Sequence, residues 1–360
     1  MVKTLSEMNY KPETPTVKRP IVSVGAGGIV ADCHYPAYKL AGFDVIGVYD
    51  LNVERAREMA EKFGVPRVCE TLEQLVQLAS RNGAIYDIAV PASALVQVLK
   101  SIPDNSPVLI QKPMGESIEQ AREILGLCRK KHLVAGVNFQ LRQAPYIIAA
   151  KKLIDEGVIG DICDFEIREC VFTPWNLWDF LFKVDRMEIN YHSIHFVDVM
   201  RYFLGNPKGV YCKTMKHPKM MELAQVKSNM IFDYGDTMRA GIISNHNHEY
   251  GLEEQECFLK IEGTKGAIKL VMGVYLDYPV GLPDKFKYIN LEDKKGWREI
   301  EIKGSWFPEA FVGTMGGLMK KLEDPSYHYI NDVEDAYKTM CLVEACYQSE
   351  ANGEILVDYK

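Results

Sequence analysis

The 360-residue sequence predicts a two-domain α/β protein. We expect a doubly wound parallel sheet first, followed by an α+β domain with a large, open, mostly antiparallel sheet. Three observations support this. The chain is longer than the ~250–300 residues that usually share one hydrophobic core. Short apolar runs alternate with helical patterns over residues 20–138, and longer stretches of period two follow residue 142. The predicted parts are an arm (1–19), the parallel-sheet domain (20–141) and the α+β domain (142–360).

Five short apolar runs supply the strands of the first domain. Helical patterns such as 53–63 and 118–131 lie between them. A continuous apolar run is typical of a strand in a parallel sheet, because helices cover both faces of such a sheet. The runs are residues 21–24, 45–49, 85–90, 108–110 and 133–137.

A glycine-rich turn follows the first run. In this pattern a buried strand, a tight turn and a helix N-terminus bind a diphosphate. The residues of the turn are Gly25, Gly27, Gly28 and Ile29. Asp50 closes the second run about twenty residues further on, where a carboxylate accepts hydrogen bonds from a ribose diol. The pattern predicts a Rossmann-type NAD site, and a 2′-phosphate beside Asp50 would meet a like charge, which disfavours NADP. The alternative role of Asp50 is to cap the helix that follows.

After residue 142 the pattern changes to that of an α+β domain. A helical pattern over 144–156 ends at Gly157 and Gly160, which are typical stop signals. Stretches of period two separated by tight turns then predict a mostly antiparallel sheet. These stretches are residues 162–170, 210–215, 226–232, 238–244, 256–262 and 267–271. Helical patterns follow at 307–322 and 333–351, and we expect the second to pack back on the first domain.

Composition and charge exclude several classes of partner. The net charge of -7 provides no basic stripe for a nucleic acid. No stretch approaches the ~20 apolar residues that span a bilayer. The polar residues 1–19 lack the apolar core of a signal peptide and predict a loose arm. The open sheet has a broad face and edges to cover, which predicts a homo-oligomer.

The nine cysteines indicate a reducing compartment. They are scattered along the chain and contain no C-x-x-C pair. We therefore interpret them as small buried hydrophobic residues of a cytoplasmic protein, and neither as a disulfide framework nor as a zinc site.

Five motifs, in this order and spacing, resemble the glucose-fructose oxidoreductase / inositol dehydrogenase / MocA (Gfo/Idh/MocA) family over roughly residues 20–355. The motifs are Gly25-Ala26-Gly27-Gly28-Ile29, Gln111-Lys112-Pro113, Asn138-Phe139-Gln140-Leu141-Arg142, Gly157-Val158-Ile159-Gly160-Asp161 and His195-Phe196-Val197-Asp198. The resemblance implies an NAD-dependent oxidoreductase that acts on a carbohydrate or polyol.

The resemblance implies that Lys112 contacts both the cofactor ribose and the reacting hydroxyl. Lys112 also follows a buried run, and open α/β sheets bind ligands at the carboxyl ends of their strands. Gln111 replaces the glutamate of the family motif, so the lysine lacks its usual neighbouring carboxylate. Its protonation state is therefore open.

In the family a histidine moves the hydroxyl proton, and His195 occupies that position. A pKa near 6.5 suits a histidine to this work at neutral pH. Tyr191 replaces the aspartate of the motif; it either joins the hydrogen-bonded cluster or packs. His192, one helical turn before His195, is the alternative base, and Asp198, one turn after it, is placed to orient the ring.

Further residues are candidates for contacts with substrate or cofactor. A sugar ring would suit Trp175, Trp178 and Asp179, because aromatic faces stack on its C–H faces and a carboxylate binds its hydroxyls. The alternative is that the two tryptophans are core or interface anchors. His246 and His248 are expected to bind hydroxyl groups. We expect no metal, because no third ligand accompanies His192 and His195. The expected cofactor contacts elsewhere are Pro91, Ser93, Gln111, Gln140 and Arg142.

These observations predict the oxidation of a secondary hydroxyl to a ketone with NAD. The substrate is expected to be a sugar, a cyclic polyol or a glycoside, and a glycoside 3-dehydrogenase that acts at C3 of a glucoside is the specific case. Two alternatives stay open: a reductase or oxidoisomerase that recycles tightly bound NAD(H), and a non-catalytic cofactor-binding or scaffold protein.

Overall fold

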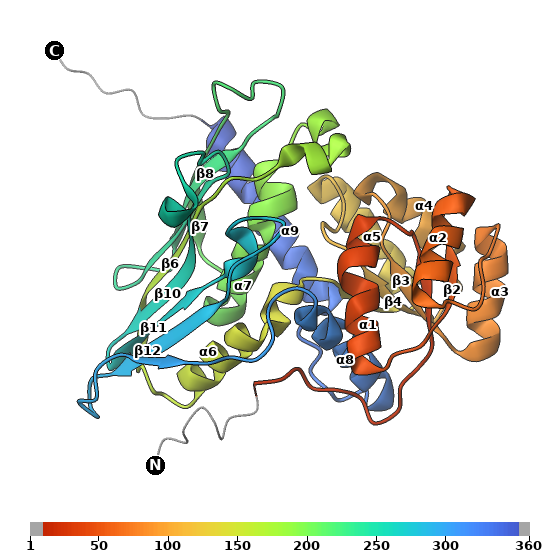
Figure 1. The fold of residues 1–360 in the computed structure, drawn as a ribbon, viewed down its shortest axis with the longest axis horizontal. Coiled ribbons are helices and arrows are strands. Elements are labelled where there is room, and N and C mark those ends of the chain that lie inside the picture. Colours follow the sequence, from red (N-terminus) through yellow and green to blue (C-terminus); the bar gives the residue numbers. More distant parts are fainter. Residues whose placement is uncertain (1–9, 353–360) are drawn as a thin grey trace. The chain divides into compact units, whose positions relative to one another are not determined.

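The computed structural model describes residues 10–352, which form two compact units (Figure 1). The Rossmann unit comprises residues 10–149 and Lys303–Met340, and the sheet unit comprises Ala150–Ile302 and residues 341–352. The chain thus returns to the first unit after residue 302, and it leaves that unit again within helix α9 (Val333–Ala351). The sequence pattern predicts that residues 303–340 belong to the second domain, whereas the structure groups them with the first unit.

The Rossmann unit contains a five-stranded sheet in the order β2-β1-β3-β4-β5. All of its strand pairs are parallel, which confirms the predicted doubly wound sheet. Because β2 and β3 lie on opposite sides of β1, the direction of winding reverses at β1, and ligands bind at such a reversal. The strands are β1 (Ile21–Val24), β2 (Val45–Tyr49), β3 (Ile85–Ile88), β4 (Pro107–Ile110) and β5 (Val134–Val137).

Local signals determine where most helices of this unit begin and end. Asn52, Thr71 and Ser117 cap α2, α3 and α5 by accepting hydrogen bonds from backbone amides of the first turn. The glycine turn leads into a π-helical turn, η2 (Val30–His34), before α1. The helices are α1 (Tyr35–Ala41), α2 (Val53–Phe63), α3 (Leu72–Asn82), α4 (Leu95–Ser101), α5 (Ile118–Lys130) and α8 (Glu309–Glu323).

Helix α8 belongs to the Rossmann unit because its apolar side chains enter the same core as the parallel sheet. Met315, Leu318 and Met319 are buried in one cluster with Ile21 and Leu109 of β1 and β4. Burial of each large apolar side chain in this contact stabilises the folded state by roughly 1.5–3 kcal/mol. The apolar pattern therefore predicts the helix, and long-range packing decides which sheet it covers.

Residues 10–19 also pack on α8, which corrects the expectation of a loose arm over this stretch. Pro15 is buried, and Glu13 forms an ion pair with Lys320. The hydroxyl of Thr16 donates to Glu323 at 3.1 Å, and the backbone amide of Val17 donates to the same carboxylate. The remainder of the predicted arm, residues 1–9, lies outside the described residues.

The sheet unit contains an eight-stranded sheet in the order β13-β12-β11-β10-β6-β9-β8-β7. Every pair is antiparallel except β6 with β9, which confirms a large, mostly antiparallel sheet. The strands are β6 (Ile162–Cys170), β7 (Gly209–Met215), β8 (Lys227–Asp233), β9 (Arg239–Asn245), β10 (Glu256–Gly263), β11 (Gly266–Val271), β12 (Lys285–Asn290) and β13 (Arg298–Ile300).

Helices lie against one face of this sheet (Figure 1). Phe203 of α7 (Ile194–Leu204) packs on Phe165 of β6, with ring centroids 6.0 Å apart. The last turns of α9 are held to β7, where Thr214 donates to Glu350 at 2.6 Å. On the other face the side chains of Tyr211 and Ile231, which are paired across β7 and β8, are exposed.

No helix among residues 10–352 is long and apolar enough to cross a membrane. All nine cysteines are free thiols, and five of them are buried. Cys163 and Cys341 are exposed, so the expectation of buried cysteines is wrong for these two.

Candidate functional site

The glycine turn has the shape that a dinucleotide requires. Gly25 has φ +102°, and a Cβ there would lie 2.4 Å from the carbonyl oxygen of Ala89, so only glycine fits. A Cβ at Gly27 would meet no heavy atom within 4 Å. The backbone is thus open at Gly27, which is the position where a diphosphate approaches in this type of turn.

Asp50 ties the glycine turn to the loop after β2. Its two carboxylate oxygens accept hydrogen bonds from the backbone amides of Ala26 and Asn52, both at 2.8 Å. Asn52, and not Asp50, is the residue that caps α2. Asp50 is therefore held in place from two sides at the carboxyl ends of β1 and β2, and each oxygen keeps a lone pair for a ribose hydroxyl.

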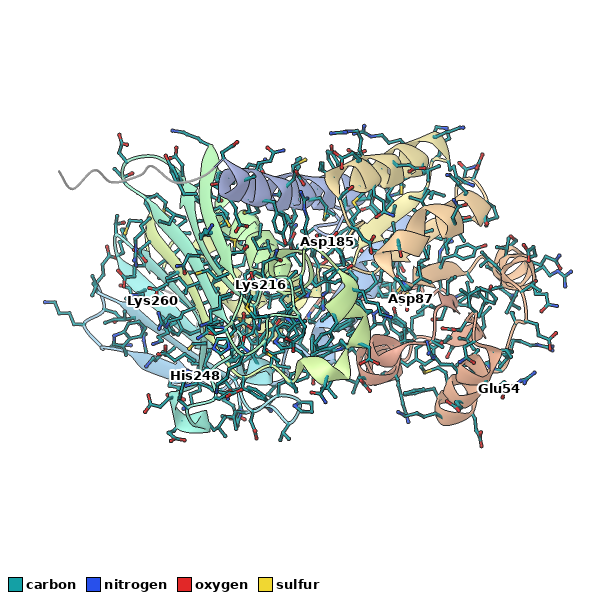
Figure 2. All side chains as sticks on the ribbon, turned by 90° about the horizontal axis from the view of Figure 1, so that it is seen from above. Glu54, Asp87, Asp185, Lys216, His248 and Lys260 are labelled. Atoms are coloured by element: carbon teal, nitrogen blue, oxygen red, sulfur yellow. The ribbon has the colours of Figure 1, made fainter. Side chains whose placement is uncertain are left out.

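A buried polar network supports the loop after β4. Asp87, which Figure 2 labels, accepts from Nδ1 of His34 at 2.8 Å. The side-chain NH₂ of Asn138 is 3.3 Å from Nε2 of His34 and donates to Oε1 of Gln111 at 3.0 Å. The hydroxyl of Thr314 of α8 donates to the side-chain oxygen Oδ1 of Asn138 at 2.8 Å. The network thus fixes Gln111 and, with it, the start of the Gln-Lys-Pro motif.

Lys112 follows directly at the carboxyl end of β4, and its side chain is partly buried. Burial disfavours the ammonium and lowers the pKa of Lys112 to about 8. The ammonium therefore predominates at neutral pH, and the free amine becomes available just above it. A lysine poised in this way suits the handling of a hydroxyl proton.

The histidine segment of the sheet unit begins with a π-helical turn, η7 (Glu188–Ser193), which leads directly into α7. His195 and Asp198 are buried in the first turns of α7, whereas His192 is partly exposed. The ring of Tyr191 packs edge-on against Phe180 at 5.6 Å. The ring of Tyr191 thus packs against an aromatic neighbour, and its expected part in a hydrogen-bonded cluster stays a prediction.

An aromatic cluster surrounds His192. Its ring centroid lies 4.8 Å from Trp175 and 6.2 Å from Trp178. Trp175 is buried, as expected of a core anchor, while Trp178 is partly exposed. Asp179 is exposed at the start of η6 (Asp179–Lys183). Trp178 and His192 thus offer ring surface, and Asp179, which follows Trp178 in the chain, offers an exposed carboxylate.

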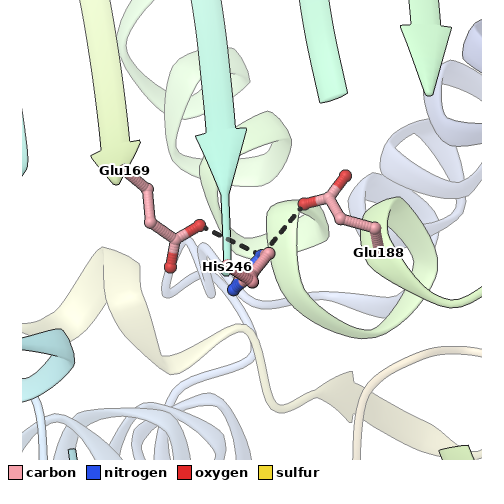
Figure 3. Close-up of side chains that lie close together, drawn as sticks. All are labelled: Glu169, Glu188 and His246. Atoms are coloured by element: carbon pink, nitrogen blue, oxygen red, sulfur yellow. Dashed lines mark hydrogen bonds and ion pairs between the residues drawn. The ribbon is translucent and has the colours of Figure 1, made fainter. Parts of the chain in front are cut away.

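A cluster of buried charged groups lies beside these rings, and the sequence analysis did not identify its two acidic members. Nε2 of His246 is 3.3 Å from Glu169 and 3.4 Å from Glu188 (Figure 3). The ring of His246 also lies 4.9 Å from that of His192. Glu169 stands at an inward-facing position of β6, where the alternation calls for an apolar residue. An acidic residue at such a position is the sequence signal that could have revealed this cluster.

Burial and mutual repulsion shift the pKa values in this cluster. Burial raises the pKa of Glu169 to about 7. Burial alone would lower the pKa of His246, but the neighbouring carboxylates of Glu169 and Glu188 outweigh that effect and raise it. Burial thus favours the neutral carboxyl of Glu169, while the neighbouring carboxylates favour the protonated ring of His246.

The two histidines of the Asn245–Glu249 stretch have different surroundings. Strand β9 ends at Asn245, so both histidines lie beyond it. His246 is fully buried, with Nδ1 2.9 Å from the hydroxyl of Thr173. His248 lies beside Cys170, whose sulfur is 3.4 Å from Nδ1, and beside the ring of Tyr250. His246 and His248 are both expected to bind substrate hydroxyls, and the structure gives them different neighbours and different degrees of burial.

The remaining predicted cofactor contacts belong to the Rossmann unit. Pro91 and Ser93 are exposed after β3, where Ser93 lies in a single 3-10 turn, η3 (Ala92–Ala94). Gln140 is buried, and its Oε1 has no hydrogen-bond partner among the described residues. The guanidinium of Arg142 donates to the carbonyl oxygen of Ile330 at 2.6 Å and pairs with Asp335 at 2.8 Å. Arg142 thus anchors the chain on both sides of the start of α9, through Ile330 before it and Asp335 within it.

Two family models match the chain. Residues 20–139 match an oxidoreductase family with an NAD-binding Rossmann fold, and residues 147–269 match a GFO/IDH/MocA C-terminal domain. Together these two matches cover more than half of the sequence.

Similar proteins include sugar oxidoreductases. The chain is 24% identical to a 1,5-anhydro-D-fructose reductase of Ensifer adhaerens, over 84% of this chain and 89% of that protein. It is 23% identical to a D-apiose dehydrogenase of Rhizobium rhizogenes, over 92% and 94%. An oxidoreductase from Agrobacterium radiobacter, solved in complex with NAD⁺, has the same fold, with a TM-score of 0.78, 19% identity and coverage of 94% and 98%.

Proposed function

Because this chain belongs to the Gfo/Idh/MocA family of oxidoreductases with an NAD-binding Rossmann fold, we propose that it oxidises a secondary hydroxyl of a sugar or glycoside to a ketone. The specific position that we propose is C3 of a glucoside. The proposal depends mainly on Lys112. Its pKa is about 8, and a buried hydrogen-bond network fixes the loop that carries it at the carboxyl end of β4.

The glycine turn and Asp50 would hold the cofactor. A Cβ at Gly25 has no room, and the carboxylate of Asp50 is anchored by two backbone amides. NAD, when bound, accepts a hydride from the carbon that carries the hydroxyl. The chain itself has to take the hydroxyl proton and stabilise the oxygen while the ketone forms.

His195 takes the proton in this proposal, and Lys112 donates a hydrogen bond to the oxygen. A general base contributes typically ~10²–10⁴-fold to such a reaction. His192 is the alternative base, but its ring lies against Trp175 and Trp178. This packing supports a role for His192 in binding the sugar ring and leaves the proton to His195.

The surroundings of His192 support a carbohydrate substrate. Trp178 is partly exposed, and Asp179 beside it is exposed. An aromatic face covers the apolar C–H surface of a sugar, while a carboxylate accepts from its hydroxyls. The named relatives, a reductase and a dehydrogenase of sugars, support the same substrate class.

The test is NADH formation by the purified full chain with NAD or NADP. The substrates are free sugars, sugar acids, inositols, and alkyl and aryl glucosides, with the 2-deoxy and 3-deoxy glucosides as matched analogues. We expect turnover of a glucoside and of its 2-deoxy analogue, but not of its 3-deoxy analogue. Turnover of the 3-deoxy analogue would overturn the assignment to C3.

Two variants test whether the measured turnover comes from this chain or from a contaminating dehydrogenase. Lys112→Met should lower kcat/KM by ~10²–10⁴-fold, whereas Lys130→Met, at an exposed position on α5, should leave it unchanged. If no substrate yields NADH, the nucleotide content of the denatured protein decides between the alternatives. Bound NAD(H) together with transfer between two sugars would indicate a recycling oxidoreductase. A chain that holds no nucleotide and catalyses no transfer would contradict an enzymatic role.

A further inference from the structure

We propose that Glu169, Glu188 and His246 form a binding site for one divalent metal ion in the sheet unit. This inference concerns a different group of side chains from the proposed redox site. It does not depend on the dehydrogenase activity.

Three elements bring the ligands together. Glu169 is the second-last residue of β6, and His246 directly follows β9. These strands are parallel neighbours in which Glu169 is paired with Ser244, so both side chains emerge at the same end of the sheet. Glu188 is the first residue of η7. Figure 3 shows the three side chains turned toward one point.

The distances fit a common ion. Nε2 of His246 is 3.3 Å from Oε2 of Glu169 and 3.4 Å from Oε1 of Glu188, and the ligand atoms of all three residues lie within 4.8 Å of one another. Nitrogen and oxygen ligands bind zinc at about 2.0–2.2 Å in a tetrahedral arrangement, which separates them by about 3.3–3.6 Å. Two of the three separations already have this value.

A single proton on Nε2 of His246 cannot serve both of the carboxylates that face it. All three side chains are fully buried. Nε2 has room for a single hydrogen, yet two carboxylates face it, and neither oxygen of Glu169 has a hydrogen-bond partner among the described residues. Their ion pairs are both with His246, and no described lysine or arginine contributes. When both carboxylates are ionised, a single imidazolium leaves a buried negative charge, whereas a divalent ion beside a neutral imidazole balances both carboxylates.

Neighbouring hydroxyls hold the ligands in place. The hydroxyl of Thr173 is 2.9 Å from Nδ1 of His246, and when Nδ1 donates to it, Nε2 presents its lone pair to the carboxylates. The hydroxyl of Ser193 donates to Oε1 of Glu188 and lies 2.8 Å from that of Ser244. Partners of this kind orient the ligands of protein metal sites.

The donor set indicates the class of ion. One imidazole and two carboxylates suit zinc and the other first-row divalent ions better than calcium or magnesium, which favour oxygen alone. The sequence predicts no metal because no third ligand accompanies His192 and His195. In the structure Glu188, four residues before His192, meets Glu169 and His246, which are distant from it in the chain. The ion would join the ends of β6 and β9 to η7, the segment that carries His192 and leads to His195.

The test measures metal content on tag-free full-length protein. The chain is treated with a chelator, equilibrated with Zn²⁺, freed of unbound metal and analysed by mass spectrometry of the elements. We expect about one zinc per chain. Glu169→Gln should lower the affinity for zinc by at least about tenfold. The matched control is Glu166→Gln on the same strand, whose side chain is partly exposed and pairs with Arg239, and it should bind like the wild type.

Two outcomes would overturn the proposal: a wild-type chain that retains no zinc, or equal zinc binding by Glu169→Gln and Glu166→Gln. If Glu169→Gln does not fold, X-ray absorption of the zinc-loaded wild type decides. One imidazole with oxygen ligands supports the site. Sulfur ligands contradict it, because the cluster contains no cysteine.

Discussion

The side-chain amide of Asn138 donates a hydrogen bond of 3.0 Å to Oε1 of Gln111, the residue directly before Lys112. Asn138 is itself held by Thr314 of α8 and lies 3.3 Å from His34. The loop that carries Lys112 is therefore fixed from within the Rossmann unit. Gln111 supplies the acceptor that this network needs, and it does so without a negative charge.

Replacing Gln111 by glutamate keeps the acceptor and adds a charge beside Lys112. A neighbouring carboxylate favours the ammonium, so we expect the pKa of Lys112 to rise and the alkaline limb of kcat/KM to move to higher pH. The measurement is the pH profile of Gln111→Glu beside that of Gln97→Glu, which changes an exposed position. Identical profiles for the two variants would contradict the coupling.

The activity should decline as the pH rises through about 8. The folded-state pKa of Lys112 lies below its ordinary value, so the ammonium is present below about pH 8 and is lost above it. Lys112→Arg keeps a cation and should remove this limb, while Lys112→Met should reduce kcat/KM by ~10²–10⁴-fold below about pH 8, where the wild type holds the ammonium. A wild-type profile that stays flat to pH 10 would show that the ammonium is not required.

Asp50→Asn should weaken the preference for NAD over NADP. The amide retains one acceptor oxygen for the Ala26 and Asn52 amides but removes the charge that repels a 2′-phosphate. We expect the ratio of kcat/KM values for the two cofactors to fall by about tenfold, which corresponds to about 1.4 kcal/mol. Thermal unfolding of the variant, compared with that of Asn52→Ala, separates a damaged turn from a changed preference.

The two histidines should respond differently to replacement. His195→Asn removes the base, so we expect kcat to fall by ~10²–10⁴-fold with a small change in KM. His192→Asn removes ring surface beside Trp175 and Trp178 and should mainly raise KM. Steady-state kinetics at several pH values distinguish the variants, and the reverse pattern would assign the proton to His192.

The open sheet should mediate self-association. Tyr211 is 71% exposed and Ile231 is 60% exposed on the uncovered face. A lysine in place of Ile231 should therefore lower the molar mass measured by light scattering, because burial of a lysine at an interface is unfavourable. Leu51→Lys, at an exposed position of the Rossmann unit, is the control. A monomeric wild type would contradict the prediction.

The glycine turn and the strand alternation were predictable from the sequence, because neighbouring residues determine them. Gly25 requires a positive φ, whereas the cap of α2 is Asn52 and not Asp50, the residue that the sequence suggested. The alternation of Ile162–Cys170 likewise gave the strand and its inward face. These features depend on periods of two and 3.6 residues and on local hydrogen bonds.

Only the tertiary structure decided which distant residues meet. α8 joins the first sheet through Met315 and Leu318, although its sequence follows the second. Asn138 fixes the loop of Lys112 through its hydrogen bond to Gln111, and the partners of His246 are Glu169 and Glu188. Burial of a charge depends on contacts between elements that are far apart in the chain, and residue spacing does not specify them. The sequence therefore determined the elements and the cofactor turn, whereas long-range packing determined the surroundings of each titratable group.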